Sequence, residues 1–185
     1  RYSVTVAARL DSARKRWESI SSFSPFILKG GYNMNSKDIQ RIAVIGAGQM
    51  GHQIGMLCAL GGYETIIQDM NEQSLIEAKN KLEAIIDKWV HKGKISSDAK
   101  EAAFQRLSFT STLKEAVSSA DFVIEAVVEK LDVKQSVFKE IDEYAPSHAI
   151  LASNSSTIVN SLIASATNRP EQIVNMHFFF PPLVM

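Results

Sequence analysis

Four short stretches of the chain carry side chains that could bind a ligand or move a proton. They are GAGQMG (46–51), EAVVEKLDVK (125–134), LASNSST (151–157) and NMHFFFPP (175–182). Each follows or closes an apolar run of the kind that forms a buried strand. Because open parallel sheets bind their ligands at the carboxyl ends of the strands, we expect the four stretches to meet at one edge of a sheet.

The first stretch matches the pattern GxGxxG in the context that gives the pattern a physical role. It leaves the apolar run 42–46 and opens a helical pattern over 49–60. There the first glycine permits a tight turn, the second lets the backbone approach a pyrophosphate, and the third lets helix and strand pack closely. Free N–H groups at the helix N-terminus favour the phosphates. The candidate cofactor-binding residues of this loop are Gly46, Gly48, Gln49, Met50 and Gly51.

A carboxylate follows at the end of the next predicted strand, 64–69. Asp69 lies about 20 residues beyond the glycines, where a carboxylate accepts hydrogen bonds from ribose hydroxyls. It would repel a 2′-phosphate, so the predicted cofactor is NAD rather than NADP. The alternative is that Asp69 caps the next helix. His52, beside the glycine loop, is interpreted as a helix-face residue, and no metal site is predicted.

Strand and helix patterns alternate through the rest of the chain. The predicted strands are 42–46, 64–69, 107–110, 121–127, 149–153 and 173–179. The predicted helices are 49–60, 71–91, 97–106, 131–144 and 157–166. This alternation predicts an α/β fold with a Rossmann-type, doubly wound, mostly parallel sheet that has helices on both faces. We assign residues 34–185 to this NAD-binding domain.

Residues 1–33 have a different composition, rich in Arg and Ser and with little periodicity. We expect an N-terminal extension that is disordered or loosely docked, either a tag or a targeting segment. Asp11 and Glu18 argue against a transit peptide, because such peptides are poor in acidic residues. The expected location is therefore cytoplasmic, with the mitochondrial matrix as the alternative if the extension directs import.

The overall composition excludes several classes of partner. Twenty basic residues balance twenty acidic ones, which gives no electrostatic case for nucleic acid or an anionic membrane. No stretch approaches the roughly 18 apolar residues of a spanning helix. The single cysteine, Cys58, excludes an internal disulfide and falls among apolar residues, so we expect it to pack in the core.

The glycine loop and the three later stretches together resemble the NAD-binding domain of 3-hydroxyacyl-CoA dehydrogenases, including the 3-hydroxybutyryl-CoA enzymes. The resemblance runs from about Ile39 to Met185, and the ASNSS stretch followed by HFF is its most specific part. It implies an oxidoreductase of fatty acid β-oxidation that converts a 3-hydroxyacyl-CoA to the 3-oxoacyl-CoA and passes hydride to NAD. His177 then resembles the general base, and Ser156 the serine that hydrogen-bonds the reacting oxygen.

The same resemblance assigns three further residues to the site. Asn154 is expected to contact cofactor or substrate, and Glu129 and Lys134 match positions near the nicotinamide ribose and the substrate. Each has a structural alternative: a serine and asparagine cluster after a strand often caps a helix, and Glu129 and Lys134 could be an ordinary solvated helix start.

The sequence departs from the family pattern in two ways. Phe180 occupies the position of an asparagine in the family's HF-x-N-P motif, which puts substrate anchoring in doubt or indicates a different acyl group. The glutamate that pairs with the histidine, and the helical C-terminal domain that usually forms the homodimer, belong to sequence beyond Met185. We therefore expect this truncated chain to be impaired in catalysis.

Two alternatives remain beside the dehydrogenase. The chain could be a non-catalytic NAD(H)-binding or redox-sensing module, which Phe180 would suit. It could also be a dehydrogenase of the 3-hydroxyisobutyrate type, although those enzymes use a lysine base and lack the ASN-x-S and HFF pairing.

Overall fold

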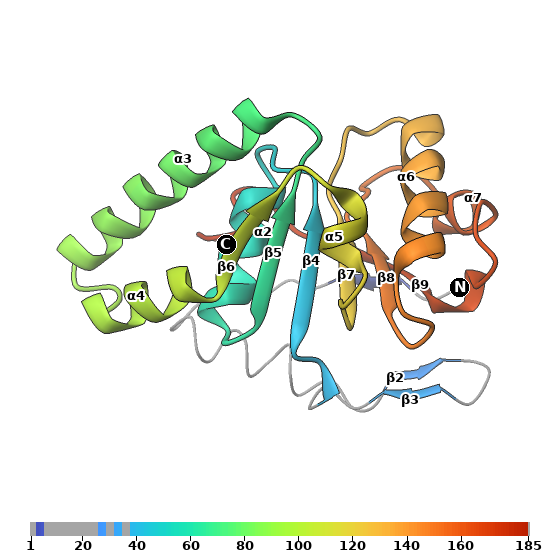
Figure 1. Cartoon of the computed structure of the whole chain (residues 1–185), viewed down its shortest axis with the longest axis horizontal. Coiled ribbons are helices and arrows are strands. Elements are labelled where there is room, and N and C mark those ends of the chain that lie inside the picture. The colour runs from blue at the N-terminus through green and yellow to red at the C-terminus, as the bar shows by residue number, and fades with distance from the viewer. Residues whose placement is uncertain (1–2, 6–25, 29–31, 35–37, 185) are drawn as a thin grey trace.

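A seven-stranded, wholly parallel sheet forms the centre of the computed structural model, which describes residues 3–5, 26–28, 32–34 and 38–184 (Figure 1). Its strand order is β1-β9-β8-β7-β4-β5-β6. The strands are β1 (Ser3–Thr5), β4 (Arg41–Ile45), β5 (Glu64–Gln68), β6 (Leu107–Thr110), β7 (Phe122–Glu125), β8 (Ile150–Ser153) and β9 (Ile173–His177). From β4 the chain winds outward to β6, then crosses to β7 and winds outward the other way. This doubly wound topology confirms the predicted fold, and it places a ligand crevice between β4 and β7.

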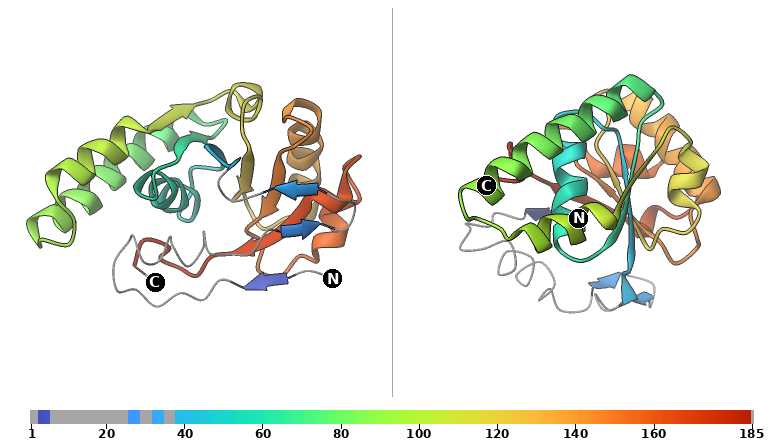
Figure 2. Two further views of the ribbon diagram at one scale, coloured as in Figure 1. Left: turned by 90° about the horizontal axis from the view of Figure 1, so that it is seen from below. Right: turned by 60° about the vertical axis from the view of Figure 1, so that its left-hand side comes forward.

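Helices cover both faces of the sheet, as the right-hand view of Figure 2 shows. One face carries α2 (Gly51–Leu60), α3 (Glu72–His91) and α4 (Ser97–Gln105). The other face carries α5 (Leu113–Val117), α6 (Leu131–Tyr144) and α7 (Asn160–Ala164), and a 3₁₀ turn, η2 (Pro170–Gln172), leads into β9. Each layer of helices encloses its own buried apolar cluster against the sheet.

The alternation of side chains along each strand explains the two clusters. In β4, Ile42 and Val44 join the cluster under α2, whereas Ala43 and Ile45 join the cluster on the opposite face. Successive side chains of a strand point to opposite faces, so a strand covered on both sides needs an unbroken apolar run. The same rule places Glu125 on the α6 side of β7, together with Val123.

The boundaries of several elements differ from the predicted ones at the points where the chain leaves the sheet and enters a loop. Strand β7 ends at Glu125 rather than at 127, and β9 ends at His177 rather than at 179, because the next residues turn away to line a cleft. The five-residue helix α5 was not predicted, since one turn is too short to show a period. Helix α7 is half as long as the predicted helix over 157–166, because the turn before it is held by side-chain hydrogen bonds.

Short strands occur in the N-terminal extension. Strand β1 pairs in parallel with β9, with Thr5 opposite His177, and β2 (Phe26–Leu28) pairs antiparallel with β3 (Tyr32–Met34). The disorder predicted for the remainder of 1–33 concerns residues outside the described part of the chain. Over the residues that are described, no helix has the length and apolar character needed to cross a bilayer.

Arg169 fixes the turn that leads into β9. Its Nε donates to Asp142 Oδ1 at 2.6 Å, and its Nη atoms donate to the carbonyl oxygens of Asp142, Ala145 and Pro146 at the end of α6. Partial burial acts to raise the pKa of Asp142. The hydrogen bonds from Asn168 and Arg169 and the charge of Arg169 outweigh burial, so the pKa of this carboxyl lies below its ordinary value. The planar guanidinium thus satisfies the last carbonyls of a helix and a carboxylate at once.

We predict that Arg169→Lys lowers the free energy of unfolding by about 1–3 kcal/mol, because an ammonium cannot reproduce the fork of donors. Urea unfolding followed by circular dichroism measures the change. The control is Lys81→Ala, which removes an exposed ion pair with Glu77 and is expected to change stability by less than about 0.5 kcal/mol. Equal effects of the two substitutions would contradict this assignment.

Candidate cofactor and active site

The glycine loop packs so tightly that two of its glycines admit no side chain. Gly46 has φ +102°, and a Cβ on it would lie 2.8 Å from the carbonyl oxygen of Ala126. A Cβ on Gly51 would lie 1.7 Å from the carbonyl oxygen of Gly46. A Cβ on Gly48, in contrast, would meet no heavy atom within 4 Å. Gly46 and Gly51 therefore serve the fold, and Gly48 leaves open space on the side from which a phosphate would approach.

The start of helix α2 has features suited to an anion. No side chain caps its N-terminus, and no acidic residue lies in its first turn. The positive end of the helix dipole and the N–H groups of the first turn are therefore open to a phosphate. Gln49 and Met50, both predicted cofactor contacts, lie at this position in the loop.

His52 supports the glycine loop from the buried side. Its Nδ1 lies 2.5 Å from the carbonyl oxygen of Gly48, and its side chain is buried. Burial lowers the pKa of His52, so the ring is neutral at pH 7 and Nδ1–H can donate to that carbonyl. Gln53 donates similarly to the carbonyl of Gln49 at 3.2 Å. His52 is thus more than a residue on a helix face, because it orients the backbone that a phosphate would contact.

Asp69 connects the end of β5 to the glycine loop. Its Oδ2 accepts from the N–H of Ala47 at 2.9 Å, and its Oδ1 accepts from the N–H of Asn71 at 3.0 Å. The cap of helix α3 is Asn71, whose side chain accepts from Gln73 and Ser74. The alternative that Asp69 is the helix cap is therefore wrong. Its carboxylate lies beside the loop, half exposed, with lone pairs left for a ligand.

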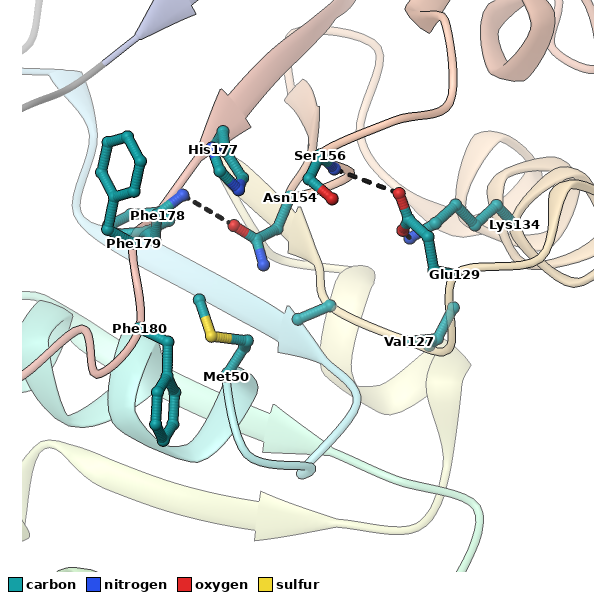
Figure 3. Close-up of a pocket in the computed structure, with 11 residues that line it drawn as sticks. Met50, Val127, Glu129, Lys134, Asn154, Ser156, His177, Phe178, Phe179 and Phe180 are labelled. Atoms are coloured by element: carbon teal, nitrogen blue, oxygen red, sulfur yellow. Dashed lines mark hydrogen bonds and ion pairs between the residues drawn. The ribbon is translucent and has the colours of Figure 1, made fainter.

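A cleft of about 330 Å³ opens between the glycine loop and the ends of β7, β8 and β9 (Figure 3). Its apolar wall consists of Met50, Ala126, Val127, Phe178, Phe179 and Phe180. Its polar wall consists of Glu129, Lys134, Asn154, Ser156 and His177. The structure thus brings these five predicted site residues together with Met50 at the start of α2, although the five come from three separate stretches of the chain. The other two predicted polar residues, Gln49 and Asp69, do not line this cleft.

Glu129 holds the turn that carries Ser156. Its Oε1 accepts from Ser155 Oγ at 2.5 Å, from the N–H groups of Ser156 and Thr157 at 3.1 Å, and from Thr157 Oγ1 at 3.1 Å. Partial burial acts to raise the pKa of Glu129, but the hydrogen bonds from Ser155 and Thr157 and the charge of Lys134 outweigh burial and lower it to about 2. Glu129 is thus an anion that hydrogen bonds hold in place at the cleft, although 38% of its side chain remains exposed.

Lys134, in contrast to Glu129, is buried, so the alternative of a solvated helix start is wrong for it. Its side chain is 1% exposed, and its Nζ lies 2.7 Å from Glu125 Oε1 and 3.2 Å from Glu129 Oε2. Lys134, Phe138 and Ile141 share the buried stripe of α6, at the helical spacing of three and four residues. That spacing is the sequence signal that could have predicted its burial.

Sequence reasoning missed Glu125, which is fully buried at the end of β7. Its Oε1 accepts from the N–H of Val127 at 2.7 Å, and its Oε2 accepts from Ser153 Oγ at 2.7 Å. Ser153 lies directly opposite Glu125 in the neighbouring strand β8. The one available signal was a carboxylate at the end of an otherwise apolar strand, on the face that α6 covers.

Asn154 connects the serine turn to the segment that carries His177. Its Oδ1 accepts from the N–H of Phe178 at 2.8 Å, and its own N–H donates to the carbonyl of Glu125. The His177 ring makes an edge-to-face contact with Phe179, with ring centroids 5.1 Å apart. Figure 3 shows Asn154, Ser156 and His177 grouped at one side of the cleft. Phe180 lies across the cleft, near Met50, with 59% of its surface exposed.

The family described as "3-hydroxyacyl-CoA dehydrogenase, NAD binding domain" matches residues 41–185. The chain belongs to this family. The match confirms the family and the cofactor, NAD, that the sequence motifs predicted. A probable 3-hydroxybutyryl-CoA dehydrogenase of Bacillus subtilis (strain 168) is 37% identical over 148 residues, which are 80% of this chain and 51% of that protein.

Solved structures show the same similarity. The crystal structure of FadB2 from M. tuberculosis has a TM-score of 0.75 and 36% identity, over 77% of this chain and 50% of that one. A 3-hydroxybutyryl-CoA dehydrogenase from Escherichia coli K12 has a TM-score of 0.77 and 33% identity, over 80% of this chain and 31% of that one. The chain therefore spans about half, or less, of the length of these relatives.

Gly48, beside open space, and Gly51, packed against backbone, give a matched test of the glycine loop. We predict that Gly48→Ala leaves the fold intact but weakens NADH binding about tenfold or more, because the new methyl group enters the space left for the phosphates. Gly51→Ala should instead destabilise the domain by about 3 kcal/mol or more, since a backbone carbonyl cannot move aside. NADH fluorescence and thermal unfolding measure the two effects. A Gly48→Ala protein that binds NADH normally would rule out this position for the phosphates.

The clamp made by Glu129 predicts an acid-sensitive component of stability. The folded-state pKa of Glu129 is about 2, below the ordinary value of 4.5, so its contribution is complete above about pH 4.5 and is lost as the pH falls toward 2. Urea unfolding at several pH values in that window should show a shallower fall in stability for Glu129→Gln than for the wild type. Parallel pH profiles would show that the clamp does not form.

Proposed function

We propose that the chain is the NAD-binding half of a 3-hydroxyacyl-CoA dehydrogenase, which oxidises a 3-hydroxyacyl-CoA to the 3-oxoacyl-CoA with hydride transfer to NAD. The observation that carries the proposal is the convergence of His177, Ser156 and Asn154 on a cleft that begins at the glycine loop. The family match and the relatives named 3-hydroxybutyryl-CoA dehydrogenase support it.

The residues of the glycine loop and of β5 fit the cofactor. The open space at Gly48 and the uncapped start of α2 suit the pyrophosphate, and the half-exposed carboxylate of Asp69 suits ribose hydroxyls. Glu129, Lys134 and Asn154 would border the nicotinamide end of the cleft. When bound, the nicotinamide supplies the acceptor for the hydride that leaves C3 of the substrate.

His177 is proposed as the general base. As the hydride leaves C3, the C3–O bond becomes a carbonyl, and the hydroxyl proton must pass to a base. A ring nitrogen of neutral imidazole can take that proton near pH 7. The bond from the Phe178 N–H to Asn154 Oδ1 fixes the backbone immediately after His177 and so limits where the ring can lie.

Ser156 is proposed to hydrogen-bond the reacting oxygen. Its side chain is exposed at the cleft, while its N–H is held by Glu129. This leaves the hydroxyl free to turn toward a substrate, while the backbone that bears it stays in place. The apolar wall opposite offers a surface for an acyl chain, and Phe180 makes that wall more apolar than an asparagine would.

A non-catalytic NAD(H)-binding or redox-sensing module is the second candidate. The exposed ring of Phe180, which has no hydrogen-bonding group, favours it over an enzyme that needs a polar anchor at this position. We also propose, from the resemblance alone, a homodimer of the whole protein. A cytoplasmic location is proposed, with the mitochondrial matrix as the alternative.

We predict that His177→Ala lowers NADH-dependent reduction of acetoacetyl-CoA by about 10²–10⁴-fold, the usual contribution of a general acid–base group. NADH binding, followed by fluorescence in the same samples, should change little. The assay applies to this chain and to any longer protein that contains it. His91→Ala, at the end of α3, is the control histidine. Normal turnover by the His177 variant would contradict the assigned role, and NADH binding without turnover by a longer protein that contains this chain would favour the second candidate.

A further inference from the structure

Glu125, Lys134 and Glu129 form a cluster of ionisable groups at the polar end of the cleft (Figure 3 shows Glu129 and Lys134). The ammonium of Lys134 lies between the two carboxylates, and the side chains of Lys134 and Glu125 are 1% and 0% exposed. Only Glu129 has substantial contact with solvent, with 38% of its side chain exposed. Water therefore screens the charges of Glu125 and Lys134 poorly, and it screens the charge of Glu129 in part.

The charges of the cluster do not cancel. Glu125 accepts hydrogen bonds on both oxygens, from Val127, Lys134 and Ser153, as an ionised carboxylate does. Glu129 accepts on both oxygens as well. Two carboxylates and one ammonium leave one net negative charge beside the cleft.

The oxidised and reduced forms of NAD differ in the charge of the nicotinamide ring, which is the part that accepts the hydride. The nicotinamide ring is positively charged in NAD⁺ and neutral in NADH. His177 can act only on a hydroxyl whose carbon lies next to that ring, so the ring belongs in the cleft that Glu129 and Lys134 line. A fixed negative charge there attracts the oxidised ring and has little effect on the reduced one.

We propose that the Glu125–Lys134–Glu129 cluster raises the affinity of the cleft for NAD⁺ relative to NADH. The inference rests on the proposed binding of NAD at this cleft. In this proposal the buried carboxylate of Glu125 acts through its negative charge, and not only through the hydrogen bonds that it accepts. The cluster stabilises the cofactor in the form that accepts hydride, and it thereby favours release of NADH after the reaction.

Glu125→Gln tests the proposal without altering any group that lines the described cleft. The amide keeps one oxygen for Val127 and Lys134, and Ser153 Oγ can rotate to accept from the new NH₂ group. The net charge of the cluster becomes zero. The matched control is Ser153→Ala, which removes a hydrogen bond from the same carboxylate but keeps every charge.

The measured quantity is the ratio of the dissociation constants of NAD⁺ and NADH at pH 7.5. NADH is titrated by fluorescence, and NAD⁺ by calorimetry, on the intact chain. For Glu125→Gln the ratio should rise by roughly three- to tenfold, the effect of one charge at several ångströms in a partly screened site. For Ser153→Ala the ratio should equal that of the wild type, even if both constants increase. Circular dichroism checks that each variant is folded, and Glu129→Gln serves as a second neutralising variant if Glu125→Gln does not fold.

An unchanged ratio in a folded, neutralised variant would overturn the proposal. So would a parallel loss of affinity for both forms, because that result means the cluster only holds the loops in place. If the wild-type chain binds neither NAD⁺ nor NADH, the proposed function fails first, and this failure is distinct from the other two.

Discussion

The carboxyl ends of β4 and β7 meet the first turn of α2 at distances that leave no room for a side chain. Gly51 packs against the carbonyl of Gly46, and Gly46 packs against the carbonyl of Ala126. This contact of three backbones sets the direction of α2 and places its uncapped N-terminus at the point where the sheet reverses its winding. The cleft forms here because the chain leaves the two adjacent strands toward opposite faces of the sheet. β4 leads to α2 on one face, and β7 leads through a loop to α6 on the other.

Charges rather than close packing hold the opposite side of the cleft. Burying Glu125 and Lys134 is unfavourable unless each finds partners, and the structure supplies them from β7, β8 and α6. The result is a set of directional bonds that fixes the loop after β7 against the turn after β8. In proteins, replacing a buried ion pair with apolar residues of the same volume often costs no stability, but an apolar core here would not determine where the N–H groups of Ser156 and Thr157 point.

The sequence was sufficient for the order of the strands β4 to β9, because the central ones are buried on both faces. In a chain with alternating helical patterns, an unbroken apolar run as short as 42–46 fits a buried strand and little else. The glycine loop was equally predictable, since its spacing encodes backbone contacts. The buried cluster was not, because Glu125 looks the same in a sequence whether it faces water or α6. Its partners Lys134 and Ser153 come from separate elements, and only the folded sheet shows that they meet.

Ser156 and His177 depend on the same polar network, although they lie on different segments. Glu129 holds the N–H of Ser156, and Asn154, two residues earlier in that loop, holds the N–H of Phe178 next to His177. The N–H of Asn154 in turn donates to the carbonyl of Glu125. A substitution that disturbs this network would therefore move both candidate reacting groups and also change the charge at the cleft. Geometry and electrostatics can be separated only by a change that keeps the shape of a side chain and removes its charge, and the hydrogen bonds of Glu125 are compatible with such a change.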